Sequence, residues 1–110
     1  MVDAALLGQV KRKLNITWDD AETTARVEEI IKSAIPFMKH KLGIADSDDD
    51  PFEFSAAGLE NTLLLAYCLY EWNHAANEFE ENYHQMIADV RAMNEVKYHL
   101  ASEGENDAED

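Results

Sequence analysis

Two Glu-x-x-His pairs are the residues in this 110-residue chain best suited to chemistry. They are Glu71 with His74 and Glu81 with His84, a spacing that places a carboxylate and an imidazole on one helix face. A di-iron bundle needs such pairs on two helices, with a further Glu from each of two more. On one continuous helix these two pairs would point about 80° apart. We therefore expect solvated side chains here, with no metal site and no cofactor.

The acidic run at residues 46–50 imitates the opening of a calcium-binding loop. Such a loop needs Gly at its sixth place and Glu at its twelfth, where this chain has Pro51 and Ala57. The sequence has no Gly-rich phosphate-binding motif and no nucleophile patterned beside a His and an acid. It therefore predicts a protein that is not an enzyme. A metalloenzyme that uses the two Glu-x-x-His pairs is a remote alternative.

The charge of the chain is strongly negative, with 23 acidic residues against 9 basic ones and a net charge of -14. Residues 1–45 hold six acids and seven bases, whereas residues 46–110 hold seventeen acids and two bases. Binding to phosphates needs concentrated Lys and Arg, so this balance argues against sequence-specific binding of nucleic acid. We expect the near-neutral first half of one copy to attract the acidic second half of another.

The length of the chain fits a single domain, which we place at residues 1–102. The acidic tail at residues 103–110 has no apolar residue larger than Ala, so we expect it to be disordered. No apolar run approaches the roughly 20 residues that cross a bilayer, and no secretory signal is present, which predicts synthesis in the cytoplasm and no membrane partner. Cys68 lies in an apolar run, where a buried and inert thiol is expected.

Helical periodicity predicts an all-α fold, a small bundle of four to five helices with an acidic loop between two of them. The first helix should begin at Asp3 and the second at a Thr17 cap. Gly43 should end the second helix, and Pro36 should kink it.

The third helix should begin at Ser55 and is apolar nearly all round, which indicates surface that another copy covers. A break is expected at residues 73–77, followed by a fourth helix capped by Asn77. Its apolar stripe is expected to comprise Phe79, Tyr83, Met86, Ile87, Val90, Met93, Val96 and Leu100.

A set of packing and capping motifs spans about residues 7–98. They are Leu14-Asn-Ile-Thr-Trp-Asp-Asp20, Gly43, Leu65-x-Tyr67-x-x-Tyr70-x-x-Asn73, Glu78-Phe79-x-x-Asn82-Tyr83 and Ile87-x-x-x-Arg91. With them the chain resembles the head-to-tail connector, or adaptor, proteins of tailed bacteriophages, some of which are labelled DNA-packaging proteins. It departs at Leu69, where such proteins often have Arg, so a salt bridge made by that Arg is not expected here.

The resemblance implies a structural virion protein at the neck of the particle. It implies a ring of twelve copies below the portal protein that seals packaged DNA, lets it pass without sequence-specific binding, and joins a downstream neck or tail protein. We expect subunit or partner contacts at Lys11, Arg12, Lys13, Trp18, Leu69, Trp72 and Tyr83. We expect a channel-facing acidic loop at Asp46, Asp48, Asp49 and Asp50. The alternative is an acidic DNA mimic that inhibits a host nucleic-acid-binding protein.

Overall fold

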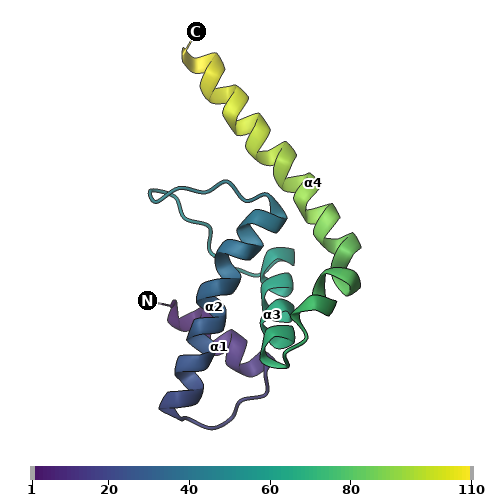
Figure 1. The fold of residues 1–110 in the computed structure, drawn as a ribbon. Coiled ribbons are helices and arrows are strands. Elements are labelled where there is room, and N and C mark those ends of the chain that lie inside the picture. Colours follow the sequence, from purple (N-terminus) through teal and green to yellow (C-terminus); the bar gives the residue numbers. More distant parts are fainter. Residues whose placement is uncertain (1, 110) are drawn as a thin grey trace.

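Four α-helices make up the described part of the computed structural model, which covers the backbone of residues 2–109 and the side chains of residues 2–99 (Figure 1). No strand occurs in this part of the chain, so the predicted all-α bundle is confirmed. None of the helices is long and apolar enough, within the residues described, to cross a membrane. The helices are α1 (Ala4–Lys13), α2 (Ala21–Leu42), α3 (Leu59–Trp72) and α4 (Ala76–Glu109).

The central helix of the bundle is α3, which packs against α1, α2 and α4. Leu63, Leu64 and Cys68 on this helix are fully buried, while Leu69 and Trp72 are half-buried. The third helix therefore exposes less apolar surface than its sequence suggests. The rest of the buried core comes from all four helices and their connections: Leu6, Val10, Leu14, Ile16, Val27, Ile31, Ala34, Met38, Leu42, Ile44, Phe54, Ala66, Tyr67, Phe79 and Val90.

The first two helices begin at carboxylate caps. Asp3 caps α1 as predicted, because its side chain accepts a hydrogen bond from the backbone NH of Ala5 at 3.2 Å. The predicted Thr17 cap of α2 is wrong, since Asp20 is the N-cap residue. Its carboxylate accepts from the hydroxyl of Thr23 at 2.8 Å and from the backbone NH of Thr23 at 3.0 Å. These bonds lower the pKa of Asp20 below its usual value.

The third helix begins later than the sequence suggested. The predicted start at Ser55 is wrong, because α3 begins at Leu59, after Gly58, and has no side-chain cap. The preceding segment is held by tertiary contacts instead. Asn61 donates its side-chain amide to the carbonyl of Phe54 at 2.7 Å and to Oε1 of Gln9, on α1, at 2.8 Å. Phe54, which precedes α3 in the sequence, is buried in the core.

The predicted break after the third helix is confirmed. His74 has a left-handed backbone with φ of 59°, and α4 begins at Ala76. The predicted cap at Asn77 is wrong, since Asn77 lies inside the first turn of α4.

The fourth helix sets the elongated shape of the protein. It comprises 34 residues, which at the rise of an α-helix is about 51 Å, and the whole structure measures 56 × 30 × 19 Å. Its first half packs on α2 and α3, and its second half projects beyond them (Figure 1). The predicted boundary between a domain at residues 1–102 and a disordered tail at residues 103–110 falls outside the described side chains, and it stays a prediction.

Candidate functional site

Two side chains of α4 close the C-terminal end of α2. Nη1 of Arg91 donates to the carbonyl oxygens of His40 at 2.9 Å and Lys41 at 3.2 Å. Nδ2 of Asn94 donates to the carbonyl oxygen of Leu42 at 2.8 Å. The last carbonyls of a helix have no partner within the helix, so the bonds to Lys41 and Leu42 satisfy groups that would otherwise need water. They fix where α4 leaves the bundle.

The burial of Asn94 reverses part of the predicted apolar stripe. Asn94 is 6% exposed, whereas Met93 and Val96, both predicted to face the core, are 55% and 60% exposed. The prediction is wrong for these two residues because the end of α2 needs an amide donor and not an aliphatic side chain. The signal in the sequence was the four-residue step from Val90 to Asn94, which places an amide on the face of a buried valine.

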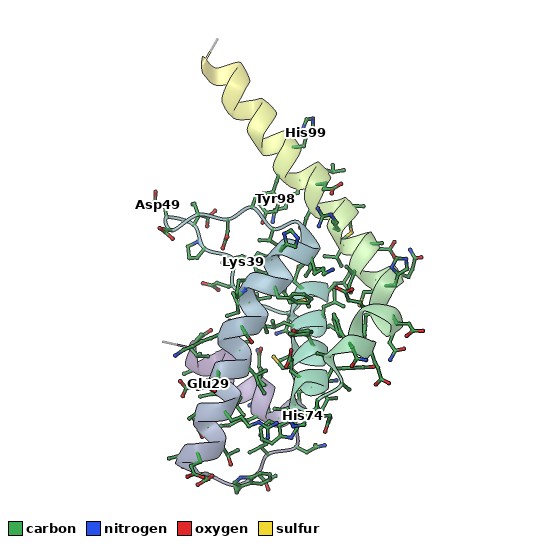
Figure 2. The ribbon with its side chains drawn as sticks, in the orientation of Figure 1. Glu29, Lys39, Asp49, His74, Tyr98 and His99 are labelled. Carbon is green, nitrogen blue, oxygen red and sulfur yellow. The ribbon has the colours of Figure 1, made fainter. Side chains whose placement is uncertain are left out.

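In the acidic loop between α2 and α3, the first aspartate is held by contacts within the chain and the later three are exposed. Oδ2 of Asp46 lies 2.8 Å from Nζ of Lys39 and accepts from the backbone NH of Phe52, also at 2.8 Å. These two contacts, with Lys39 the stronger, hold the pKa of Asp46 below its usual value. Asp48, Asp49 and Asp50 are exposed, and Asp49 lies at the outer end of the loop, away from the helices (Figure 2).

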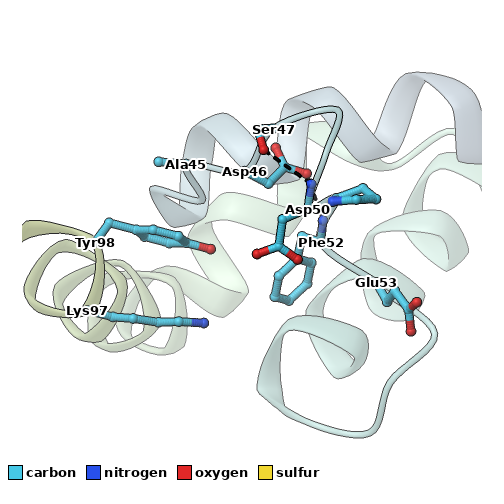
Figure 3. A pocket seen from close by; sticks show the side chains of 9 residues that line it. Ala45, Asp46, Ser47, Asp50, Phe52, Glu53, Lys97 and Tyr98 are labelled. Carbon is cyan, nitrogen blue, oxygen red and sulfur yellow. Dashed lines mark hydrogen bonds between the residues drawn. The ribbon is translucent and has the colours of Figure 1, made fainter. Parts of the chain in front are cut away.

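The loop and α4 enclose a shallow pocket of about 240 Å³. Lys97 and Tyr98 line it from α4, opposite Asp46 and Asp50 (Figure 3). Burial, followed by the nearby carboxylates of Asp46, Glu60 and Asp50, raises the pKa of Tyr98. A hydrogen bond at 3.2 Å from the backbone NH of Asp50 to the hydroxyl of Ser47 closes a turn in the loop (Figure 3). The loop is thus folded against α4 on its inner side.

The three basic residues Lys11, Arg12 and Lys13 occupy the last turn of α1. Nζ of Lys11 donates to Oγ1 of Thr24 at 2.8 Å, a bond that ties α1 to α2. Arg12 and Lys13 are exposed. Two of the three basic residues therefore remain accessible to a partner.

The two tryptophans have different surroundings. Trp18, in the connection between α1 and α2, is 52% exposed, and its Nε1 donates to Oγ1 of Thr23 at 3.2 Å. Trp72 is half-buried under the guanidinium of Arg26, whose central carbon lies 4.2 Å from the ring centroid. Arg26 also donates to the carbonyl oxygen of Trp72 at 3.1 Å. Trp72 thus stabilises the fold, and Trp18 is the more accessible of the two.

The other two predicted interface residues pack largely within the chain. Tyr83 stacks on Phe79 with ring centroids 5.0 Å apart, and it meets Tyr70 edge-on at 5.9 Å. Nδ2 of Asn82 donates to the hydroxyl of Tyr70 at 2.9 Å, which joins α4 to α3. Leu69 is half-buried against the core.

The Glu-x-x-His pairs are not brought together. Glu71 accepts the hydroxyl hydrogen of Tyr67 at 2.8 Å, and Nε2 of His74 lies 3.4 Å from Arg26. Glu81 and His84 are exposed on α4. Over the described residues, no group of three or more His, Cys, Asp or Glu is placed to hold a metal ion.

The single cysteine is buried in α3, as predicted. Burial, and secondarily the charge of Glu71, raises the pKa of the Cys68 thiol to about 12. The nucleophile of thiol chemistry is the thiolate, so a protonated and buried Cys68 is poorly reactive at neutral pH.

Apolar residues lie along one side of α4, where Met93 and Val96 are exposed and Met86 is half-buried. Met86, Met93 and Val96 follow one another at spacings of seven and three residues, which place them on one side of the helix. Leu59, 43% exposed, lies beside Met86 in a groove between the start of α3 and α4. We call these four residues the α4 flank.

A second groove, of about 710 Å³, lies between α1, α2 and the segment at residues 51–55. We call it the α1–α2 groove. Leu6 and Phe54, each 3% exposed, and the half-buried Ile35 and Phe52 supply its apolar lining. Three exposed charged side chains also line the groove: Lys32 from α2, Asp3 from the start of α1 and Glu53 from the loop.

No family model matches the chain, and searches of curated proteins and of solved structures find no match either.

Proposed function

We propose that this chain is a subunit of the head-to-tail connector of a tailed bacteriophage. In this role it forms a ring below the portal at the virion neck, seals the packaged DNA and joins the head to a downstream neck or tail protein. The observation that carries the proposal is the second half of α4, which projects from a well-packed bundle and keeps Met93 and Val96 exposed. Exposed apolar surface on an elongated helix favours an assembly role.

The motifs shared with connectors all have structural tasks in this chain. Asp20 caps α2, Gly43 ends it in the left-handed conformation with φ of 64°, and Arg91 closes the same end from α4. The bond from Asn82 to Tyr70 joins α3 to α4. These contacts support a common bundle with the connector proteins, and none of them is a catalytic arrangement.

The distribution of charge also favours a connector over a DNA mimic. A mimic needs an acidic surface in place of the phosphate backbone, yet α1 carries three basic residues and no acid. A ring, by contrast, can turn one acidic segment toward its channel. Carboxylates at Asp48, Asp49 and Asp50 would repel the phosphates of passing DNA and keep it from adhering.

The direct test is binding to the portal protein encoded in the same genome. We expect the purified chain to bind assembled portal rings and to add a ring of density at one end in electron micrographs. Because a portal has twelvefold symmetry, the mass of the complex should increase by about twelve subunits. A chain that stays free at 12.5 kDa in the presence of the portal would contradict the proposal.

The acidic loop gives a second test. Replacing Asp48, Asp49 and Asp50 with Lys should impede passage of DNA, measured as genome packaging and ejection by phage carrying the variant. The matched control replaces three exposed acids elsewhere, Glu22, Glu78 and Glu81, with Lys. Equal behaviour of the two triple variants would show that the loop does not line the channel.

A further inference from the structure

We infer that the α4 flank docks an amphipathic helix of another protein, one that carries a Lys or Arg among its apolar residues. The inference rests on the proposed assembly role and adds the chemistry of the partner that covers this surface.

Three of the four large apolar residues that are exposed among the described side chains belong to the α4 flank. They are Leu59, Met93 and Val96, which are 43%, 55% and 60% exposed. Leu59 and Met86 also line a groove of about 510 Å³ between the start of α3 and α4. Covering these side chains would remove apolar surface from water, which stabilises a complex.

The spacing of the flank fits a helical partner. Met86, Met93 and Val96 span about 15 Å of α4. Side chains at seven- and three-residue spacings form a ridge that packs against the side chains of a second helix. An extended partner would instead need a sheet edge, and no strand occurs in the described part of the chain. Methionine is unbranched and flexible, so two methionines on the flank can adapt to the shape of the partner helix.

The charge within the flank selects a basic partner. Among the described residues that line the groove, Asp89 is the only charged side chain. It follows Met86 by three residues and precedes Met93 by four, so it lies in the middle of the apolar flank. Its carboxylate accepts from the amide of Gln85 at 2.9 Å and takes part in none of the described ion pairs. Covering a carboxylate without a counter-charge is costly, so the partner helix needs a base opposite Asp89.

The charges next to the flank agree with this preference. Glu78, eleven residues before Asp89 and therefore on the same side of α4, is a second exposed acid. Lys97 follows Met93 by four residues, but its Nζ lies 5.2 Å from the ring centroid of Tyr98. Lys97 also lines the pocket at the acidic loop (Figure 3). Its charge is thus directed to the loop and not to the groove that holds Asp89.

A second copy of the chain does not offer such a helix among its described residues. The three bases of α1 occupy its last turn, while its apolar residues Leu6 and Val10 are buried in the core. With nine acids and two bases, α4 carries a net charge of -7, so pairing α4 with α4 would oppose two negative helices. The partner is therefore a different protein.

The test is a selection from a displayed library of helical peptides against the full-length chain. The peptides have about 18 residues, which is longer than the flank, and they are randomised along one face. We expect the bound peptides to carry apolar residues at three- and four-residue spacings with a Lys or Arg among them. Binding of a synthetic peptide with the consensus sequence is then measured by fluorescence anisotropy in about 0.15 M salt, which screens distant charges.

Paired variants locate the bound peptide. Met93→Gln with Val96→Gln should weaken binding of the consensus peptide by at least about tenfold, because it removes apolar contacts and keeps residues that favour a helix. The control, Asn77→Gln with Ala88→Gln, changes two other exposed residues of α4 that do not line the groove. All four positions are exposed, so both variants should keep the circular dichroism of the parent.

A second pair of variants tests the charge. Peptides selected against Asp89→Lys should carry Asp or Glu in place of the selected base, because the counter-charge that the groove requires is reversed. Glu81→Lys makes the same change of charge at an exposed position of α4 outside the groove. Peptides selected against this control should still carry a base.

Four results would overturn the inference: a library that yields no binder, consensus peptides without a base, equal binding to the parent and to Met93→Gln with Val96→Gln, or selection against Asp89→Lys that still favours a base. Self-association of the parent that Met93→Gln with Val96→Gln abolishes, measured by sedimentation equilibrium, would also overturn it, since a second copy would then be the occupant.

Portal binding is measured separately, so the connector role can stand if no helix docks on the flank. Conversely, selective binding of the peptide by a chain that does not bind the portal would retain the docking surface and reject the connector role.

Discussion

The third helix and the second half of the fourth contain similar apolar side chains in different surroundings. Leu63 and Leu64 on α3 are fully buried because three other helices pack around them. Met93 and Val96 on α4 are exposed, in a part of the helix whose described contacts are with the end of α2 and the acidic loop. Apolar content therefore does not identify a binding surface by itself. What matters is how many neighbours the fold gives to each helix.

The largest expected effect is a difference in the free energy of unfolding between a substitution in α3 and one in the second half of α4. Leu64→Ala should lower the free energy of unfolding by about 2–5 kcal/mol, because it leaves a cavity at a fully buried position. Met93→Ala should change it by less than about 0.5 kcal/mol, because the side chain is mostly in water. Urea denaturation of the monomer measures both. Similar losses for the two variants would show that the second half of α4 is buried in the monomer.

A smaller effect is expected where α4 meets the end of α2. Asn94→Ala should cost about 1–3 kcal/mol, because it leaves the carbonyl of Leu42 without its donor at a buried position. In the same variant, the rate of amide hydrogen exchange along the second half of α4 should increase. Gln85→Ala is the control, since Gln85 donates to Asp89 at the surface and its loss should cost little. If exchange in α4 is the same in both variants, Asn94 does not hold the helix.

Replacing each of two glycines with Ala should change the stability in opposite directions. Gly43 has φ of 64°, so Gly43→Ala should destabilise the protein by about 1 kcal/mol. Gly8 lies inside α1, where an added Cβ would have only ordinary contact with Arg12 at 3.5 Å, so Gly8→Ala should stabilise it by about 0.5–1 kcal/mol. Thermal unfolding followed by circular dichroism compares them. A melting temperature of Gly43→Ala equal to or above that of the parent would contradict the left-handed cap.

The smallest expected effect is at Asp46, in the acidic loop between α2 and α3. The pKa of Asp46 is lowered in the folded state, so its ionised form contributes stability above the usual value of 3.8 and loses it as the pH falls through the folded pKa. Asp46→Asn should cost about 1 kcal/mol or less at pH 7, because the pair with Lys39 is partly solvated.

The difference between parent and Asp46→Asn should shrink once the pH falls below 3.8, as measured by urea denaturation at several pH values. Asp49→Asn removes the same charge from the outer end of the loop and should have a smaller effect at pH 7. A cost for Asp46→Asn that persists unchanged at the lowest pH would mean that the hydrogen bond to Phe52, and not the charge, holds the loop.

Much of the fold could be predicted from local signals. Asp3 caps α1, Gly43 ends α2, the chain breaks after Trp72, and Cys68 is buried. Each follows from side chains within a few residues along the chain, because capping, turn formation and helical periodicity are short-range effects. Acidic charge and the lack of a patterned catalytic group were equally evident in the sequence.

The placing of exposed and buried side chains required the tertiary structure. Asn94 is buried because it donates to Leu42, 52 residues away in the chain, and this contact turns Met93 and Val96 outward. The late start of α3 has the same kind of cause, since Asn61 reaches across to Gln9 on α1. Periodicity along one helix specifies which residues share a face, but only the polar groups and neighbours supplied by distant segments determine which face is covered.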